Sequence, residues 1–236
     1  RNQGEGAARN TAIGAASQPW IGVLDSDDAW HPDLLATLWP LRAGHVLVAG
    51  AALYRRAGGE IERYAGLPWG ARRRLASPRA LIAGGNPIPA SGVLARRDVV
   101  LACGGFDASL RFCADLDLWL RMLEHGTGVL SARPVVDYHL HAGQVTRDRA
   151  AAAAGHRRVL EGYADRPWFA RPLLEAWRGG VAWDDLREAL GEGRGGGMVA
   201  TARFLAGHPA RPAGLARLLI TRALMRRRLS ALDPGS

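Results

Sequence analysis

Lysine is absent from this 236-residue sequence, so all 31 basic residues are arginine. We interpret this first as a compositional bias, together with the many alanines and glycines, and only second as a functional feature. Cysteine is scarce: Cys103 and Cys113 are too few for a disulfide framework, which favours a reducing compartment. No secretory signal opens the sequence. The longest uncharged apolar run, Val46 to Leu53, is far short of the roughly 20 residues that a membrane span needs.

The charge is positive overall and unevenly distributed. The formal net charge is +9, and 48% of the residues are hydrophobic, which excludes a chain disordered throughout. Residues 1–150 hold 17 arginines against 14 acidic residues, whereas residues 151–236 hold 14 against 8. A basic tail suggests an anionic partner such as a membrane surface, a phosphate-bearing substrate or nucleic acid. A solvated face in an arginine-biased sequence explains it equally well.

The apolar pattern alternates between helix and buried strand. Residues 6–16 have helical spacing, residues 20–24 form a short strand, a helix follows Pro32, and residues 45–54 form another strand. This order predicts an α/β domain. From about residue 150 the pattern becomes helical, so we place a soft boundary there, giving domains 1–150 and 151–236. The last helix, residues 215–232, is basic and amphipathic, and could either pack on the domain or lie on an anionic bilayer.

An acidic cluster follows the first strand directly. Asp25, Asp27 and Asp28 stand at its carboxyl end, where ligands gather in open α/β sheets. Carboxylates this close repel each other unless a cation compensates, and Mg²⁺ or Mn²⁺ take carboxylate ligands together with substrate phosphates. The cluster therefore predicts a site for a metal–diphosphate. The alternative is a capped loop, in which Ser26 or Asp28 caps the next helix; the trailing Trp30 favours the metal.

Four short segments stand in order over residues 2–145, at residues 2–10, 21–32, 104–107 and 115–121. They read as an Asn-x-Gly-x-x-x-Ala-Arg-Asn segment, a strand with an Asp-x-Asp motif, a Gly-Gly-Phe-Asp turn and an Asp-x-Asp-Leu-Trp-x-Arg segment. Together, and in this order, they resemble the motifs of glycosyltransferase family 2.

The resemblance implies a Rossmann-like GT-A fold for nucleotide-diphospho-sugar transfer and an inverting, single-displacement reaction. An acceptor hydroxyl would attack the anomeric carbon while a base removes its proton, and a nucleoside diphosphate would leave, helped by Mn²⁺ or Mg²⁺. On this resemblance Asp27 binds the metal, Asp25 lies toward the nucleotide and Asp115 is the base. Glutamate often precedes that aspartate in the family, but Ala114 stands here. Asp115 could otherwise be an ordinary acid at a helix start.

Further candidate residues surround these aspartates. Arg9 could contact the donor or support the loop of Asp25, and His141 resembles a histidine that approaches the metal or the diphosphate. We place Ser91 and Trp119 on the acceptor side, with core packing as the alternative for Trp119. Asp117 is expected to fix local structure and Arg121 to form a local ion pair. The run of arginines at residues 72–74 could bind an anionic acceptor or be solvated.

The family fold begins with a strand–helix–strand unit that carries much of the nucleotide-base pocket and precedes the Asn-x-Gly segment. Here Arg1 stands immediately before that segment. We therefore expect either a fragment or an N-terminally truncated protein. A chain that lacked this unit would bind nucleotide poorly and expose an apolar sheet edge.

The expected partners are a nucleotide-sugar donor and a glycan, lipid-linked or other hydroxyl acceptor, with no nucleic acid. The expected setting is the cytoplasm, with peripheral contact at the inner face of the membrane, in cell-envelope polysaccharide synthesis. Three alternatives remain: a non-catalytic basic protein that binds nucleic acid or a membrane surface, a nucleotidyltransferase of the same fold, and an inactive truncated glycosyltransferase. The nucleotidyltransferase would leave the segment around Asp115 unexplained.

Overall fold

The computed structural model describes residues 4–67, 70–83, 86–141 and 149–169. The chain divides into two compact units, Arg1–Leu173 and Leu174–Ser236, and the second lies outside the described residues. The basic helix predicted at residues 215–232 lies outside them as well. In the part that the structure describes, no helix is both long and apolar enough to cross a membrane.

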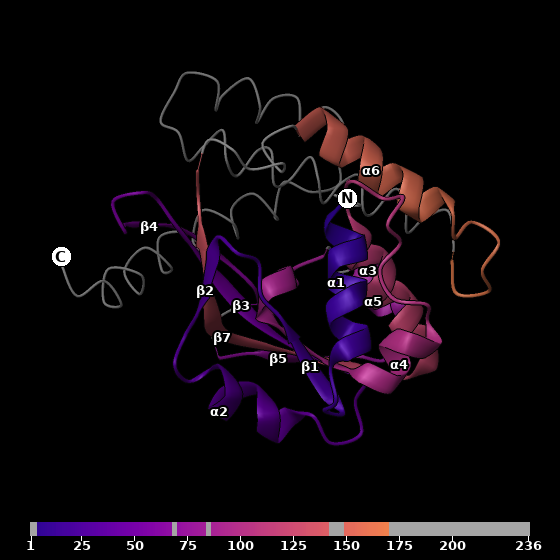
Figure 1. The fold of residues 1–236 in the computed structure, drawn as a ribbon, viewed down its shortest axis with the longest axis horizontal. Coiled ribbons are helices and arrows are strands. Elements are labelled where there is room, and N and C mark those ends of the chain that lie inside the picture. Colours follow the sequence, from indigo (N-terminus) through magenta and orange to yellow (C-terminus); the bar gives the residue numbers. More distant parts are fainter. Residues whose placement is uncertain (1–3, 68–69, 84–85, 142–148, 170–236) are drawn as a thin grey trace, which may run out of the picture. The chain divides into compact units, whose positions relative to one another are not determined.

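The first unit is built on a mixed sheet, drawn in Figure 1. Its path runs β1-β6-β3-β7-β2, with β4 added beside β3 and β5 beside β7. Among the described pairings, β3 and β7 run parallel and the others are antiparallel. The strands are β1 (Trp20–Val23), β2 (Asp28–Trp30), β3 (Leu47–Arg55), β4 (Ile61–Ala65), β5 (Arg72–Leu75), β6 (Val93–Arg96) and β7 (Gly128–His139).

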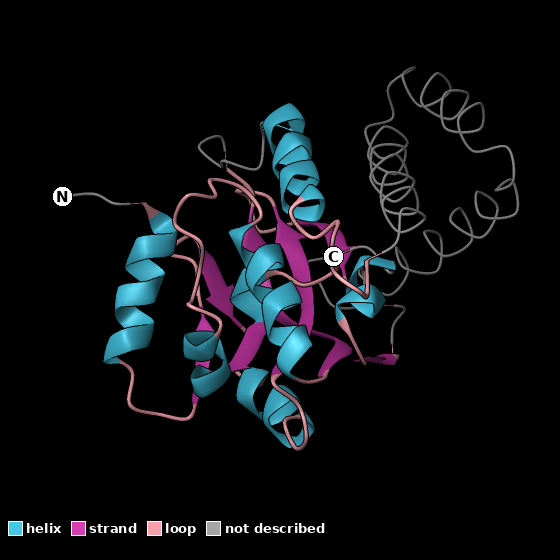
Figure 2. Ribbon diagram, turned by 90° about the vertical axis from the view of Figure 1, so that its right-hand side faces the viewer, coloured by secondary structure: helices cyan, strands magenta, loops and turns pink. Residues whose placement is uncertain are grey.

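The helices gather mainly on one side of this sheet. Figure 1 shows α1, α3, α4 and α5 together and α2 apart from them, and Figure 2 shows helices in front of the strands. The 3-10 turn η1 (Trp39–Leu41) extends α2, and η2 (Ala90–Gly92) precedes β6. The α-helices are α1 (Glu5–Ala15), α2 (Leu34–Leu38), α3 (Pro78–Ala83), α4 (Arg97–Ala102), α5 (Ala114–His125) and α6 (Arg149–Glu161).

Two apolar clusters hold the layers together. Helix α5 is amphipathic, and it buries Leu116, Trp119, Leu120 and Leu123. Helix α2 contributes a second cluster, whose buried members are Leu34, Leu38, Val48, Leu94, Val129 and Val135. Each fully buried leucine stabilises the fold by about 1.5–3 kcal/mol before entropy is counted. These clusters fix the strands beside the acidic cluster and helix α5, whose first turn carries Asp115.

The α/β class and the alternation of helices and strands are confirmed, with two local differences. Residues 72–74, to which the sequence analysis assigned no secondary structure, form strand β5 by pairing with the first half of β7. Residues 28–30 form strand β2, paired with the second half of β7. Helix α2 begins only at Leu34, six residues after Asp28. The alternative in which Ser26 or Asp28 caps that helix is therefore wrong.

Candidate active site

The acidic cluster lies in the tight turn between β1 and β2. The amide of Asp28 donates to the carbonyl of Asp25 at 3.1 Å, which closes the turn. The Arg9 guanidinium, from α1, forms ion pairs with Asp25 and with Glu5. Arg9 therefore neutralises part of the negative charge of the turn.

Ser91 holds this turn in place through two hydrogen bonds of its hydroxyl group. Its hydroxyl donates to Asp28 Oδ2 at 2.5 Å and accepts from the Asp25 amide at 3.1 Å. The Trp30 indole donates to the Ser91 carbonyl at 2.6 Å, and its ring lies against Gly22, where any Cβ would come within 2.8 Å of it. Glycine in this apolar strand thus leaves the space that the Trp30 ring occupies.

The end of β7 brings two histidines to Asp27. His141 Nε2 lies 2.8 Å from Asp27 Oδ2, and His139 Nδ1 lies 2.9 Å from the Asp27 carbonyl oxygen. The side chains of Asp27 and His141 are both nearly half exposed, at 42% and 45%. The structure therefore joins the two predicted metal ligands at a place that a ligand can reach.

The donor set fits a divalent ion that is shared with a diphosphate. No group of three or more histidine, cysteine or acidic side chains placed to hold an ion by themselves occurs among the described residues. A carboxylate and an imidazole suit Mn²⁺, with substrate phosphates and water completing the shell. Beside them, Asp28 Oδ1 is buried and forms no hydrogen bond within the part described. Burial, and then the charges of Asp25 and Asp27, raise the pKa of Asp28, although the Ser91 hydrogen bond opposes this.

Asp115 lies in the first turn of α5 and is partly buried. Burial raises its pKa, whereas the Leu116 amide and the charges of His156 and Arg9 lower it. The preceding Cys113 has a φ of 62°, the left-handed value found for no other non-glycine residue in the described ranges. An aspartate with a raised pKa in a charged site is a candidate general base.

Arg9 connects the acidic turn to Asp115. It pairs with Asp25 directly, and its charge lowers the pKa of Asp115. Its guanidinium carbon also lies 5.1 Å from the centre of the Phe106 ring. The two alternatives for Arg9, donor contact and structural support, are both compatible with this position.

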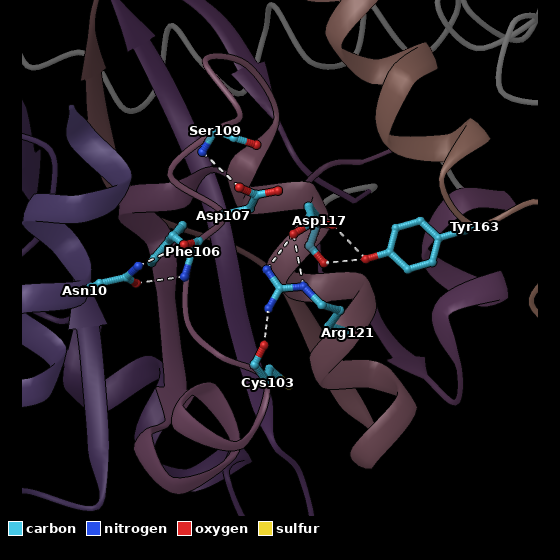
Figure 3. A network of polar contacts seen from close by, with 8 residues as sticks. All are labelled: Asn10, Cys103, Phe106, Asp107, Ser109, Asp117, Arg121 and Tyr163. Atoms are coloured by element: carbon cyan, nitrogen blue, oxygen red, sulfur yellow. Dashed lines mark hydrogen bonds and ion pairs between the residues drawn. The ribbon is translucent and has the colours of Figure 1, made fainter. Parts of the chain in front are cut away.

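The Gly-Gly-Phe-Asp turn is tied to α1 by Asn10 (Figure 3). The Asn10 side chain accepts from the Phe106 amide at 2.7 Å and donates to the Phe106 carbonyl at 2.8 Å. Gly105 has a φ of +74°, and a Cβ there would lie 2.4 Å from Asn10 Oδ1. Asp107 accepts from the Ser109 amide at 2.8 Å, and hydrogen bonding by the Ser109 side chain, together with this amide bond, lowers the pKa of Asp107. The first and third segments of the family resemblance are therefore structural partners.

Asp117 is the centre of a second network, also drawn in Figure 3. Arg121 donates to Asp117 Oδ2 from Nε at 3.0 Å and from Nη2 at 2.5 Å, and to the Cys103 carbonyl at 2.5 Å. The Tyr163 hydroxyl, beyond α6, donates to Asp117 Oδ1 at 2.7 Å. The structural role predicted for Asp117 and the ion pair predicted for Arg121 match this geometry. The network joins α4, α5 and the segment after α6.

The acceptor-side positions expected for two residues are wrong. Trp119 is 0% exposed and packs edge-on against Phe106, with ring centres 6.2 Å apart, because its helix face turns into the core. Ser91 is 1% exposed and is used entirely in bracing the acidic turn. Neither side chain can touch an acceptor in this arrangement.

Sequence reasoning missed three residues in a row, of which Tyr54 interacts electrostatically with both Asp28 and Asp115. Tyr54 is half-buried, and burial raises its pKa; the charges of Asp28 and Asp115 add to this and that of Arg63 opposes it. Tyr54 packs on Tyr138 with ring centres 4.5 Å apart. No motif marks Tyr54, Tyr138 or Arg63. Only the register of β3 with β4 and β7 brings them together.

The mixed sheet and its helical layer form an α/β fold of the GT-A type. The family model described as "Glycosyltransferase like family 2" matches residues 1–159. The chain belongs to this family, and it is therefore a glycosyltransferase by family. The resemblance seen in the sequence is confirmed.

Individual relatives share part of the chain. The "Succinoglycan biosynthesis protein ExoU" of Rhizobium meliloti (strain 1021) is 40% identical over 72 residues, which cover 28% of this chain and 21% of that protein. The "Pre-mycofactocin glycosyltransferase" of Mycobacterium tuberculosis is 26% identical over 210 residues, 84% of this chain and 43% of that protein. The chain thus spans less than half the length of these curated relatives.

Solved structures support the fold. The crystal structure of S. aureus TarS 1-349 superposes with a TM-score of 0.51 at 12% identity, covering 75% of this chain and 51% of that one. At this identity the likeness concerns the fold alone. It agrees with the mixed sheet and the helical layer described above.

Proposed function

We propose that the protein is a metal-dependent, inverting glycosyltransferase that moves a sugar from a nucleoside-diphosphate sugar to an acceptor hydroxyl. Asp27 and His141 would hold Mn²⁺ or Mg²⁺, with Asp25 on the nucleotide side and Asp115 as the base. The observation that carries this proposal is the position of Arg9. It pairs with Asp25 and acts electrostatically on Asp115, so the turn that would bind the diphosphate and the candidate base share one site.

The reaction follows from these roles. Asp115 accepts the proton of the acceptor hydroxyl through a carboxylate oxygen as the hydroxyl oxygen bonds to the anomeric carbon. The bond from that carbon to the diphosphate oxygen breaks on the opposite face, which inverts the configuration. When bound, the metal ion would supply charge neutralisation for the departing diphosphate. Burial raises the pKa of Asp115, while the Leu116 amide and the charges of His156 and Arg9 favour its ionised, proton-accepting form.

The acceptor class and the cellular setting that we propose are supported by one relative and by the composition of the chain. One relative is named for succinoglycan biosynthesis, which supports a glycan or lipid-linked acceptor in cell-envelope polysaccharide synthesis. Cys103 and Cys113 are both free, which supports a reducing, cytoplasmic setting. The basic excess beyond residue 150 supports peripheral contact with an anionic membrane.

A donor screen tests the proposed function. The purified protein is incubated with a panel of nucleotide sugars and Mn²⁺, and release of the nucleoside diphosphate is measured with and without EDTA. We expect metal-dependent release from at least one donor, and loss of release in Asp115→Asn. Release that persists in EDTA, or that Asp115→Asn leaves unchanged, would contradict the assigned roles.

A further inference from the structure

Four side chains form one row across four neighbouring strands. Directly opposite partners in the sheet are Arg63 and Tyr54, Tyr54 and Tyr138, and Tyr138 and Asp28. Residues directly opposite each other on adjacent strands project from the same face. Since strands lie about 4.8 Å apart, the row is roughly 14 Å long. It runs from β4 through β3 and β7 to β2, the strands labelled in Figure 1.

The side-chain contacts agree with this register. The guanidinium carbon of Arg63 lies 3.8 Å from the centre of the Tyr54 ring, which in turn packs on Tyr138. The adjacent residues Arg55 and Asp137 should then project from the other face, and they do contact each other, at 2.8 Å. The row is therefore continuous on a single face.

One end of the row lies within the candidate active site. Asp28 belongs to the acidic turn that would hold the diphosphate, and its charge acts on Tyr54. The charge of Asp115 acts on Tyr54 as well. Tyr54 therefore lies near both the acidic turn and the candidate base, and Tyr138 lies directly opposite Asp28 in the sheet.

The other end carries an available positive charge. Arg63 is exposed and forms no ion pair with a residue that the structure describes. The nearby Glu62 forms its ion pair with Arg56 instead, with 2.7 Å between Arg56 Nε and Glu62 Oε2. A guanidinium stacked on an aromatic ring keeps its N–H edge for an oxyanion, so Arg63 can bind a carboxylate or a phosphate in a fixed plane.

We propose that Arg63, Tyr54 and Tyr138 form the acceptor subsite, and that they select a sugar acceptor bearing a carboxylate or a phosphate. This rests on the proposed function, because it takes Asp115 as the base. The edges of the tyrosine rings would contact the acceptor sugar, since the faces of the Tyr54 ring are covered by Arg63 and Tyr138. Arg63 would hold the anionic group of the acceptor at the outer end of the row, away from the repelling acids.

Three sugars that differ in charge test the subsite. Methyl glucoside, methyl glucuronide and glucose 6-phosphate are titrated into the protein, with and without UDP and Mn²⁺, and binding is followed by ligand-observed NMR. We expect at least one charged sugar to bind about 5-fold more tightly than the neutral one, the preference that one exposed ion pair supplies. A preference for one charged sugar shows whether the site selects a carboxylate or a phosphate. A preference for both shows that it accepts either group.

Substitutions then assign that preference to residues. Arg63→Gln should abolish it and leave methyl glucoside binding unchanged, whereas Tyr54→Leu should weaken binding of all three sugars. Arg42→Gln is the matched control. The guanidinium carbon of Arg42 also lies over an aromatic ring, 3.9 Å from the centre of Trp39, but this pair lies at η1 and not in the row. This variant should keep the wild-type preference, and circular dichroism should show all variants folded.

The outcomes separate this proposal from the proposed function. Equal binding of the three sugars, or a preference that survives Arg63→Gln, overturns the subsite. Weaker UDP binding in Arg63→Gln, with unchanged sugar binding, would place the row on the donor side. That result also overturns the proposed acceptor subsite. Nucleotide-sugar turnover in those cases would leave the transferase assignment intact. A charge preference that depends on Arg63 in a protein without turnover would support the subsite and contradict the proposed function.

Discussion

Removing the Asp117 carboxylate should destabilise the protein strongly, although this residue lies two positions from the candidate base. In Asp117→Ala, the Arg121 guanidinium loses two hydrogen bonds and keeps the one to the Cys103 carbonyl. The Tyr163 hydroxyl loses its bond to the carboxylate and keeps a longer one, 3.2 Å, to the Asp117 carbonyl. Three bonds to one charged group are therefore lost together.

The magnitude follows from the exposure of this ion pair. Hydrogen bonds to charged groups contribute about 1.5–3 kcal/mol each when well buried, and the side chains of Asp117 and Arg121 are 14% and 21% exposed. With a discount for solvent screening and for the helix preference of alanine, we expect a loss of about 2–3 kcal/mol in unfolding free energy. In a domain of this size that lowers Tm by roughly 4–12 °C.

Thermal unfolding followed by circular dichroism measures this loss. Asp98→Ala is the control, because Asp98 also pairs with an arginine, Arg96, but its side chain is 62% exposed. We expect the control to lose less than ~1 kcal/mol. If Asp117→Ala were no less stable than Asp98→Ala, the network would not hold the helices together and the reasoning would be refuted.

Four further predictions concern the two paired segments and the site. Asn10→Ala removes both bonds to the Phe106 backbone and should cost about 2–3 kcal/mol in denaturant unfolding; an unchanged midpoint would contradict the pairing. Asp27→Ala should abolish Mn²⁺-dependent UDP binding in calorimetry, and retained metal-linked binding would refute its assignment. Turnover should fall with decreasing pH through the raised pKa of Asp115, above the ordinary value near 4. The same raised pKa means that Asp115 stabilises the fold only while protonated, so this stabilisation is lost as pH rises through that pKa. Asp115→Asn should therefore not lower Tm at neutral pH, and a lower Tm would contradict this.

Sequence patterns located the elements that carry strong local signals. The apolar run before Asp25, the amphipathic period of α5 and the ordered motifs were sufficient to predict the α/β class and the family. They also led to Asp27 and His141, which the fold brings within 2.8 Å of each other although 114 residues separate them. The resemblance supplied that pairing, because spacing alone contains no information on contacts between distant segments.

What the sequence could not predict depends on register and burial. The core packing of Trp119 was among the sequence alternatives and holds, whereas the burial of Ser91 against the acidic turn was not predicted, because it depends on how η2 packs there. Tyr54 and Tyr138 belong to no motif. They meet because β3 and β7 pair in parallel through two register shifts. Such positions follow from how strands align, and single-sequence periodicity does not specify that alignment.

The central claim is that Asp115 is the base of a sugar transfer whose donor is held by the acidic turn. The most direct measurement compares Asp115→Asn with the wild-type protein in two assays, transfer from the best nucleotide sugar of the panel and Mn²⁺-linked UDP binding. The account predicts that transfer is abolished while UDP binding stays within about twofold, since removing the proton acceptor leaves the diphosphate contacts intact. Retained transfer in Asp115→Asn would contradict it.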